Sequence, residues 1–181
     1  MIDEETIMIT EYIGHSNHVA IPDSLDGYRV VGLGGWGGSS FGGDFASVAL
    51  PNSLEWITGY AFNGARIDSI SIPAKVNSIQ YGALKNIKYS IYVSNDNANY
   101  ADIDGVLFNK NCTELLEFPS GRTGEYIIPE GVTSIFNSVF TNCSLERITF
   151  RGNLYCENLS FSKSTNLKSI TIEIERASCR E

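Results

Sequence analysis

Apolar residues recur along the chain in short motifs of the form apolar-x-x-apolar-x-apolar, repeated every 22 residues. The motif Phe45–Leu50 is followed 22 residues later by Ile67–Ile72, and Leu145–Phe150 is followed at the same distance by Leu167–Ile172. The last part of each motif alternates apolar and polar positions, which is the period of a strand with one buried face. Prolines directly after the motif cannot donate to a sheet ladder, and they occur at Pro51, Pro73 and Pro129. We therefore predict one short β-strand in each repeat.

A second apolar set follows each strand motif. Its four positions hold Leu54, Ile57, Ala61 and Phe62 in one unit, Val76, Ile79, Ala83 and Leu84 in the next, and Val132, Ile135, Val139 and Phe140 in a later one. A single unit cannot bury its apolar face, whereas stacked units bury a continuous core. The pattern predicts a repeat solenoid that is mostly β, with one parallel sheet and short irregular or helical outer segments.

Two insertions interrupt the 22-residue period. The first covers about residues 32–43 and is rich in glycine, and the second covers about residues 95–126. Within the second, the apolar runs Val106–Phe108 and Leu115–Phe118 flank a short polar turn, which predicts an inserted β-hairpin. We expect the solenoid to occupy residues 19–173, after an N-terminal segment or degenerate cap at residues 1–18.

Residues 174–181 fit no repeat position and form a predicted non-repeat tail. Their sequence resembles a translated sequencing adapter, I-G-R-A-S-C-R-E, with Glu175 in place of the glycine. Two origins are open: a natural polar tail, or an adapter joined to a cut gene fragment. In the second case Cys179 is not a native residue.

The units resemble the BspA-like leucine-rich repeats, whose pattern is similar to L-x-S-I-x-I-P-x-x-V-x-S-I-x-x-x-A-F-x-x-C. The segments Ile67–Leu84 and Ile128–Cys143 fit this pattern at nearly every position, and the inserted segment Tyr100–Lys110 resembles one found in that family. The chain departs from the pattern at Val93, which no proline follows, and in a weak copy at 151–166. The resemblance implies a right-handed leucine-rich-repeat solenoid from a bacterial or protist surface protein that binds proteins or host components. It implies no catalytic residues.

The net charge of the chain makes some classes of binding partner unfavourable. The 181 residues carry a formal net charge of −8, which disfavours nucleic acid and anionic membranes. No apolar run approaches the roughly 20 residues that span a bilayer. The first twelve residues are acidic and lack a secretion-signal pattern. The family resemblance implies a cell-surface or extracellular location, whereas the N-terminal segment by itself leaves a cytoplasmic location open.

Three sequence motifs could indicate a cofactor-binding or metal-binding site, but none of them meets the requirements of such a site. Gly32–Gly37 matches G-x-G-x-x-G, but more glycines follow where a dinucleotide site needs a helix. His15 and His18 lack a third metal ligand beside them, and the acidic segment 95–106 fails the spacing of a calcium-binding loop. The four cysteines show no C-x-x-C pair and are expected to be reduced. We predict no catalytic, cofactor-binding or metal-binding residue.

The candidate partner-binding positions are those that alternate with the core positions of the strands. They are Ser69, Ser71, Tyr92, Ile127, Arg147, Thr149 and Thr171. Tyrosine and arginine are favoured at binding hot spots. In the glycine-rich insertion, Trp36 and Phe41 are expected to be exposed loop anchors.

These positions and the repeat predict a non-catalytic interaction or adhesion module that binds protein. A glycan fits less well, because Tyr92 is the single aromatic residue on the predicted face. Two alternatives remain: a structural spacer in a larger surface protein, and an intracellular interaction module. The last coil, with Leu167, Ile170 and Ile172, predicts end-to-end self-association, because its apolar positions lack a neighbour on one side.

Overall fold

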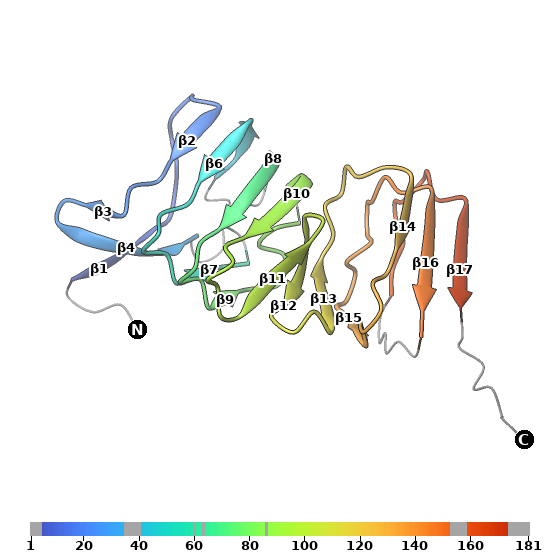
Figure 1. Ribbon diagram of the computed structural model, residues 1–181. Helices are drawn as coiled ribbons and strands as arrows, with labels where there is room; N and C mark the ends of the chain where they lie inside the picture. The colour runs from blue at the N-terminus through green and yellow to red at the C-terminus, as the bar shows by residue number, and fades with distance from the viewer. Residues whose placement is uncertain are drawn as a thin grey trace, which may run out of the picture.

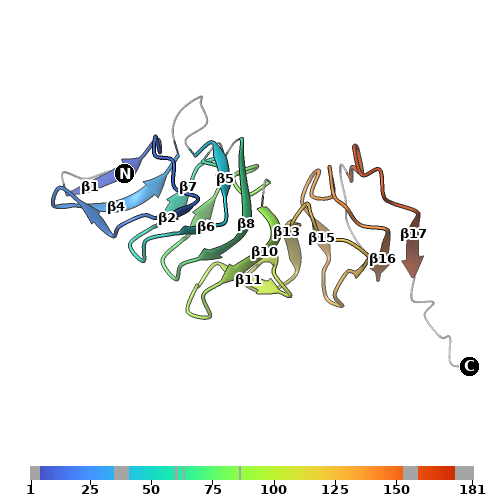
Figure 2. The ribbon, with the colours of Figure 1, turned by 90° about the horizontal axis from the view of Figure 1, so that it is seen from above.

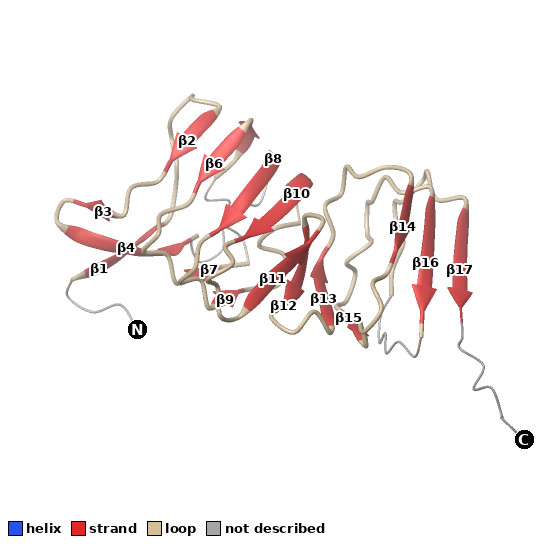
Figure 3. Ribbon diagram, viewed as in Figure 1, coloured by secondary structure: helices blue, strands red, loops and turns tan. Residues whose placement is uncertain are grey.

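The chain folds as a solenoid of about seven turns in the computed structural model, which describes residues 5–34, 41–59, 61–62, 64–85, 87–152 and 159–173. All regular structure in these ranges is β-strand (Figure 3), so the outer segments consist of short strands and irregular stretches and contain no helix there. The predicted solenoid and its mostly β character are confirmed.

The strands predicted in the first repeats form a parallel sheet, here called the front sheet. Its strand order is β10-β8-β6-β2. The strands are β2 (His18–Ala20), β6 (Ser47–Ala49), β8 (Ala65–Ile72) and β10 (Ile87–Val93). A further strand, β5 (Gly43–Phe45), pairs with the first part of β8. The register places Val48 beside Ile70 and Ile70 beside Ile91, so equivalent core positions of successive units align. The alternation of apolar and polar residues therefore sets both the buried face and the register.

A second sheet, here called the back sheet, is built from the second apolar set. Its order is β1-β4-β7-β9, with β1 (Thr6–Ile9), β4 (Tyr28–Leu33), β7 (Trp56–Ile57) and β9 (Ser78–Ile79), while β3 (Ser24–Leu25) pairs antiparallel with β4. The two sheets lie on different sides of the first coils (Figures 1 and 2). Residues 6–9 thus join the back sheet ahead of the first recognisable repeat.

The insertion at residues 95–126 contains the predicted hairpin. Its sheet, here called the insertion sheet, has the order β11-β12-β13-β15, with β11 (Tyr100–Ile103), β12 (Val106–Asn109), β13 (Glu114–Glu117) and β15 (Ser134–Ile135). Strands β12 and β13 are antiparallel, as predicted, and β11 precedes them through a tight turn. Asp104 and Gly105 in this turn have φ of 52° and 74°, which suits an Asp-Gly pair.

The prediction of one continuous parallel sheet is corrected, because the insertion occupies the edge of β10. The backbone N–H of Ile91 donates to the carbonyl of Gly105 (2.9 Å), and that of Val93 donates to Oδ1 of Asp102 (2.7 Å). The remaining repeat strands form a separate parallel sheet, here called the distal sheet. It contains β14 (Glu125–Ile127), β16 (Arg147–Arg151) and β17 (Ser169–Glu173).

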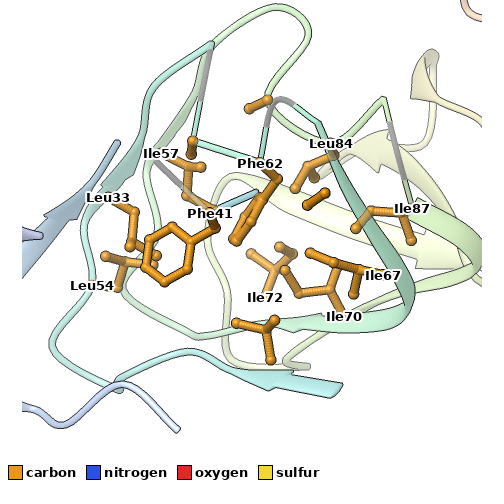
Figure 4. Packing of buried hydrophobic residues seen from close by; sticks show 14 of the residues in the cluster. Leu33, Phe41, Leu54, Ile57, Phe62, Ile67, Ile70, Ile72, Leu84 and Ile87 are labelled. Carbon is orange, nitrogen blue, oxygen red and sulfur yellow. The ribbon is translucent and has the colours of Figure 1, made fainter. Parts of the chain in front are cut away.

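Two hydrophobic clusters fill the solenoid, and they meet at β12. Leu107 belongs to the first cluster, which extends back to Val19, whereas Val106 and Phe108 belong to the second. The period of a strand explains this division, since neighbouring side chains point to opposite faces. Figure 4 shows the first cluster around Phe62, Ile67 and Ile70.

The expectation that Phe41 is an exposed loop anchor is wrong. Its side chain is 1% exposed and stacks on Tyr12, with ring centroids 6.1 Å apart, and it also contacts Phe62. The backbone N–H of Phe41 donates to the carbonyl of Ala61 (3.2 Å), so the end of the glycine-rich insertion is tied to the next coil and fills its core. Trp36 and the tail 174–181 lie outside the described residues.

Candidate functional site

The predicted partner-binding residues Ser69, Ser71 and Tyr92 lie together on the outer face of the front sheet. Register pairs place Ser69 beside Ser90 and Ser71 beside Tyr92. Strand alternation directs them away from the core, because Ile70 and Ile91 between them are buried. Tyr92 is 52% exposed and is the large side chain among these small hydroxyl groups.

A hollow of about 590 Å³ lies over β6, β8 and β10 on this face. The residues that line it are uncharged, and Ser47, Ser69, Ser71 and Tyr92 are among them. Because the backbone is held in the ladder of a parallel sheet, the Cα positions of these residues are fixed relative to one another. A neutral, rigid and shallow surface with one exposed tyrosine suits contact with a protein better than catalysis.

His18 lies at the edge of the front sheet and contacts a serine of the next strand. Nδ1 of His18 lies 2.9 Å from Oγ of Ser47, its register partner in β6. Among the residues that the structure describes, no group of three or more His, Cys, Asp or Glu side chains is arranged to hold a metal ion.

The other predicted residues, Ile127, Arg147, Thr149 and Thr171, lie together in the distal sheet and are separated from Tyr92 by the insertion. The expectation that Thr149 is exposed is wrong, since its side chain is buried. Thr149 lies on the middle strand between its register partners Ile127 and Thr171, and a short side chain flanked on both sides has little access to solvent.

Ion pairs join neighbouring coils in the distal sheet, whereas the pair of Arg66 and Asp44 in the front sheet (3.7 Å) lies outside the uncharged hollow. Nε of Arg151 is 3.0 Å from Oε2 of Glu173, and Nζ of Lys168 is 2.8 Å from Oε2 of Glu146. Lys168 lowers the pKa of the Glu146 carboxyl through a hydrogen bond and its charge. The charged groups of these residues are thus already paired with each other. Exposed ion pairs of this kind contribute little to stability.

The end of the distal sheet exposes apolar side chains. Ile172 in β17 is 67% exposed, whereas Phe150, its register partner in β16, is buried. No strand pairs with the far edge of β17 among the described residues. Self-association through this edge stays a prediction.

The oxygen-rich segment 95–106 has a structural role. Asn97 is fully buried, and its amide nitrogen donates to the carbonyls of Pro73 (2.8 Å) and Val76 (2.9 Å). Its Oδ1 accepts from the backbone N–H groups of Asn99 and Tyr100, both at 2.8 Å. Together with the bond from Val93 to Asp102, these contacts tie the insertion to the preceding coil.

A second cavity, of about 270 Å³, lies between the insertion sheet and the segment after β9. It contains a buried carboxyl, Glu117, which is 8% exposed. Burial raises the pKa of this carboxyl to about 7, although the charge of Lys85 and a hydrogen bond from the backbone of Phe118 oppose the rise. Hydrophobic periodicity did not single out this carboxyl group, although a glutamate within the apolar run Leu115–Phe118 was a usable signal.

The buried carboxyl predicts a stability that falls as pH rises. The unfolded chain ionises Glu117 near its ordinary pKa of 4.5, while the folded chain keeps the proton until about pH 7. The free energy of unfolding is therefore expected to drop by about 3 kcal/mol between pH 4.5 and 7 and to be level above that range. Urea titrations across pH 4–8.5 measure it. Glu117→Gln is expected to remove this part of the pH dependence, and Glu130→Gln, at an exposed turn, to retain it; equal profiles for the two variants would contradict the assignment.

Comparisons with known proteins agree with the architecture. A family model described as the BspA type leucine rich repeat region matches residues 40–127 and 122–179, in six copies. A leucine-rich repeat protein from Eubacterium ventriosum shares 19% identity over 88% of this chain and 54% of its own, with a TM-score of 0.59. A leucine rich cell surface protein from Faecalibacterium prausnitzii shares 24% identity over 83% of this chain and 46% of its own, with a TM-score of 0.62.

These likenesses between structures show the fold, and this chain spans about half the length of each solved relative. Among curated proteins, none matches the chain. Within the described residues, no helix is long and apolar enough to cross a membrane.

Proposed function

Because the chain belongs to the BspA-type leucine-rich repeat family, we propose that it is a non-catalytic module of a cell-surface protein that binds a protein partner through its front sheet. Repeat arrays of this kind present extended surfaces and bind through them. A surface role is supported by the name of the relative from Faecalibacterium prausnitzii, a leucine rich cell surface protein. The partner in this proposal is a protein on a host cell or on another bacterial cell.

The observation that carries the proposal is the uncharged hollow beside Tyr92. Tyrosine contributes a large contact area at a low cost in side-chain entropy, and the surrounding serines offer donors and acceptors without charge. Tyr92 stands on a sheet whose buried face is anchored by Ile70 and Ile91, so binding requires little reordering. The ion-paired distal sheet lacks this combination.

The proposal predicts that Tyr92→Arg weakens binding to cells at least tenfold, the loss typical of a central hot-spot residue. Beads coated with the chain are incubated with cultured epithelial cells and with bacterial cells, and bound beads are counted by flow cytometry. Tyr28→Arg is the matched control, because Tyr28 is 46% exposed and lies on β4 in the back sheet.

Treatment of the cells separates the kinds of partner. Binding that is lost after protease treatment supports a protein partner, whereas binding that survives protease and is lost after glycan removal contradicts it. Equal binding by the Tyr92 and Tyr28 variants would show that the front sheet is not the binding surface. No binding by the unmodified chain to either kind of cell would contradict the adhesion role.

A further inference from the structure

The cavity that holds Glu117 has a floor and a wall from different parts of the chain. The face of the insertion sheet forms the floor through Tyr100, Leu107 and Leu116, and the segment after β9 forms the wall through Tyr81 and Leu84. Phe136 approaches Tyr81 across the rim, with ring centroids 5.5 Å apart. Strands β9, β11, β12 and β13 lie close together in Figure 1. The enclosed volume, about 270 Å³, is near the lower end for small-molecule pockets.

A β-bulge aims Glu117 at this cavity. Phe108 pairs with Leu115, and a regular antiparallel ladder would then pair Leu107 with Leu116. Leu107 instead pairs with Glu117, so one extra residue is accommodated in β13. Leu107 faces the first cluster, and its partner Glu117 therefore faces the same side, among the cavity residues. Bulges that redirect one side chain are common next to functional sites.

The groups around the cavity favour a cation over an anion. Glu114 is a second carboxylate in the lining, and Lys85 is the one cation whose charge acts on Glu117. Lys85 is held by Tyr81 in the cavity wall, since its Nζ donates to the Tyr81 hydroxyl (2.5 Å) and lies 4.1 Å from the centroid of that ring. The hydroxyl of Tyr100 accepts from the backbone N–H of Ile79 (2.9 Å). The net charge of −8 also attracts cations to the protein.

The amide groups in the lining are likewise occupied. Oε1 of Gln80 accepts from the backbone N–H of Gly59 (3.0 Å), and Oδ1 of Asn109 accepts from those of Thr113 and Glu114. The two carboxyl groups are therefore the charged acceptors of the lining, and apart from these amides most of the remaining lining side chains are aromatic or aliphatic. An ammonium group is a strong donor to a buried carboxylate, and aromatic faces attract it as well.

We propose that this cavity binds the ammonium end of a primary alkylamine, with Glu117 as its anionic partner and with the alkyl chain against Leu84, Leu107 and Phe136. The amine is either a free small molecule or the side chain of a lysine on a partner. The site is separate from the front sheet, so the inference goes beyond the proposed function and can fail independently of it.

The test uses n-butylammonium as the probe and follows its binding to the whole chain by isothermal titration calorimetry and NMR shifts. Saturable binding is expected at pH 8, and binding about tenfold weaker at pH 6, because the carboxylate with a pKa of about 7 must lose its proton before it pairs with the ammonium group. Glu117→Gln is expected to weaken binding at least tenfold and to remove the pH dependence. Glu130→Gln, which changes the net charge equally, is expected to leave binding unchanged.

A second variant, Leu116→Trp, fills the cavity from its floor and keeps Glu117, and it too is expected to abolish binding. Butyramide, which is neutral, is expected not to bind. Nα-acetyl-lysine methylamide distinguishes the sources: affinity equal to that of butylammonium supports a lysine side chain, and affinity at least tenfold weaker supports a free amine. The absence of saturable butylammonium binding at pH 8, or equal affinity of the unmodified chain and the folded Glu117→Gln variant, would overturn the proposal.

Discussion

Replacement of Asn97 by alanine is expected to lower the free energy of unfolding by about 4 kcal/mol, because each buried backbone group left without a partner costs about 1–3 kcal/mol. The Asn97 side chain makes four hydrogen bonds to backbone groups from a fully buried position, to the carbonyls of Pro73 and Val76 and from the N–H groups of Asn99 and Tyr100. Water that enters the vacated space recovers part of the cost, so the four losses are not additive. Urea denaturation followed by circular dichroism measures the change.

Asn95→Ala provides the control for this variant. Asn95 lies in the same loop and is exposed, so its replacement is expected to change the free energy of unfolding by less than about 0.5 kcal/mol. Similar losses in the two variants would mean that the buried amide does not connect the insertion to the preceding coil.

Replacement of Phe41 by alanine is expected to cost about 3–5 kcal/mol, the range for a fully buried phenylalanine. The ring fills the first cluster between Tyr12 and Phe62, and its removal leaves a cavity that the neighbouring coils cannot close. Thermal and urea unfolding of the variant measure the loss.

Phe136→Ala is the matched control, because Phe136 is partly exposed at the rim of the Glu117 cavity. It is expected to lose about 1 kcal/mol, mainly from its contact with Tyr81. If Phe41→Ala were as mild as the control, the glycine-rich insertion would present the ring to solvent, as the sequence pattern alone suggested.

The repeated positions made the fold predictable. The 22-residue spacing identified the strands that contain Ile70 and Ile148, and the apolar runs around residue 110 identified the β12–β13 hairpin. Strands β1 and β3 were missed, because they precede the first clear repeat. The sequence pattern also did not predict that the repeat strands divide into two sheets. This division depends on the hydrogen bonds that residues 102 and 105 accept from β10, and the repeat period does not reveal them.

The site was less predictable, because exposure and pairing depend on neighbours that lie far apart in the sequence. Thr149 occupies an outward position, yet its neighbours in adjacent strands cover it. Phe41 stands in a glycine-rich run that resembles a free loop, and its burial depends on Tyr12 and Phe62. Glu117 reaches its cavity through a one-residue bulge, which hydrophobic periodicity does not reveal.

Strand β12 lies at the boundary between the two hydrophobic clusters, with Leu107 on one side and Val106 and Phe108 on the other. A solenoid is cooperative in one dimension, since each coil is stabilised by its immediate neighbours. At this boundary, the described repeat strands of the two halves do not pair with each other, and the halves are joined through the insertion sheet and through contacts such as that between Tyr81 and Phe136. We therefore expect local unfolding to spread less readily across this boundary than along either half. A partner that engages the front sheet is accordingly expected to stabilise the coils before β12 more than the coils after it.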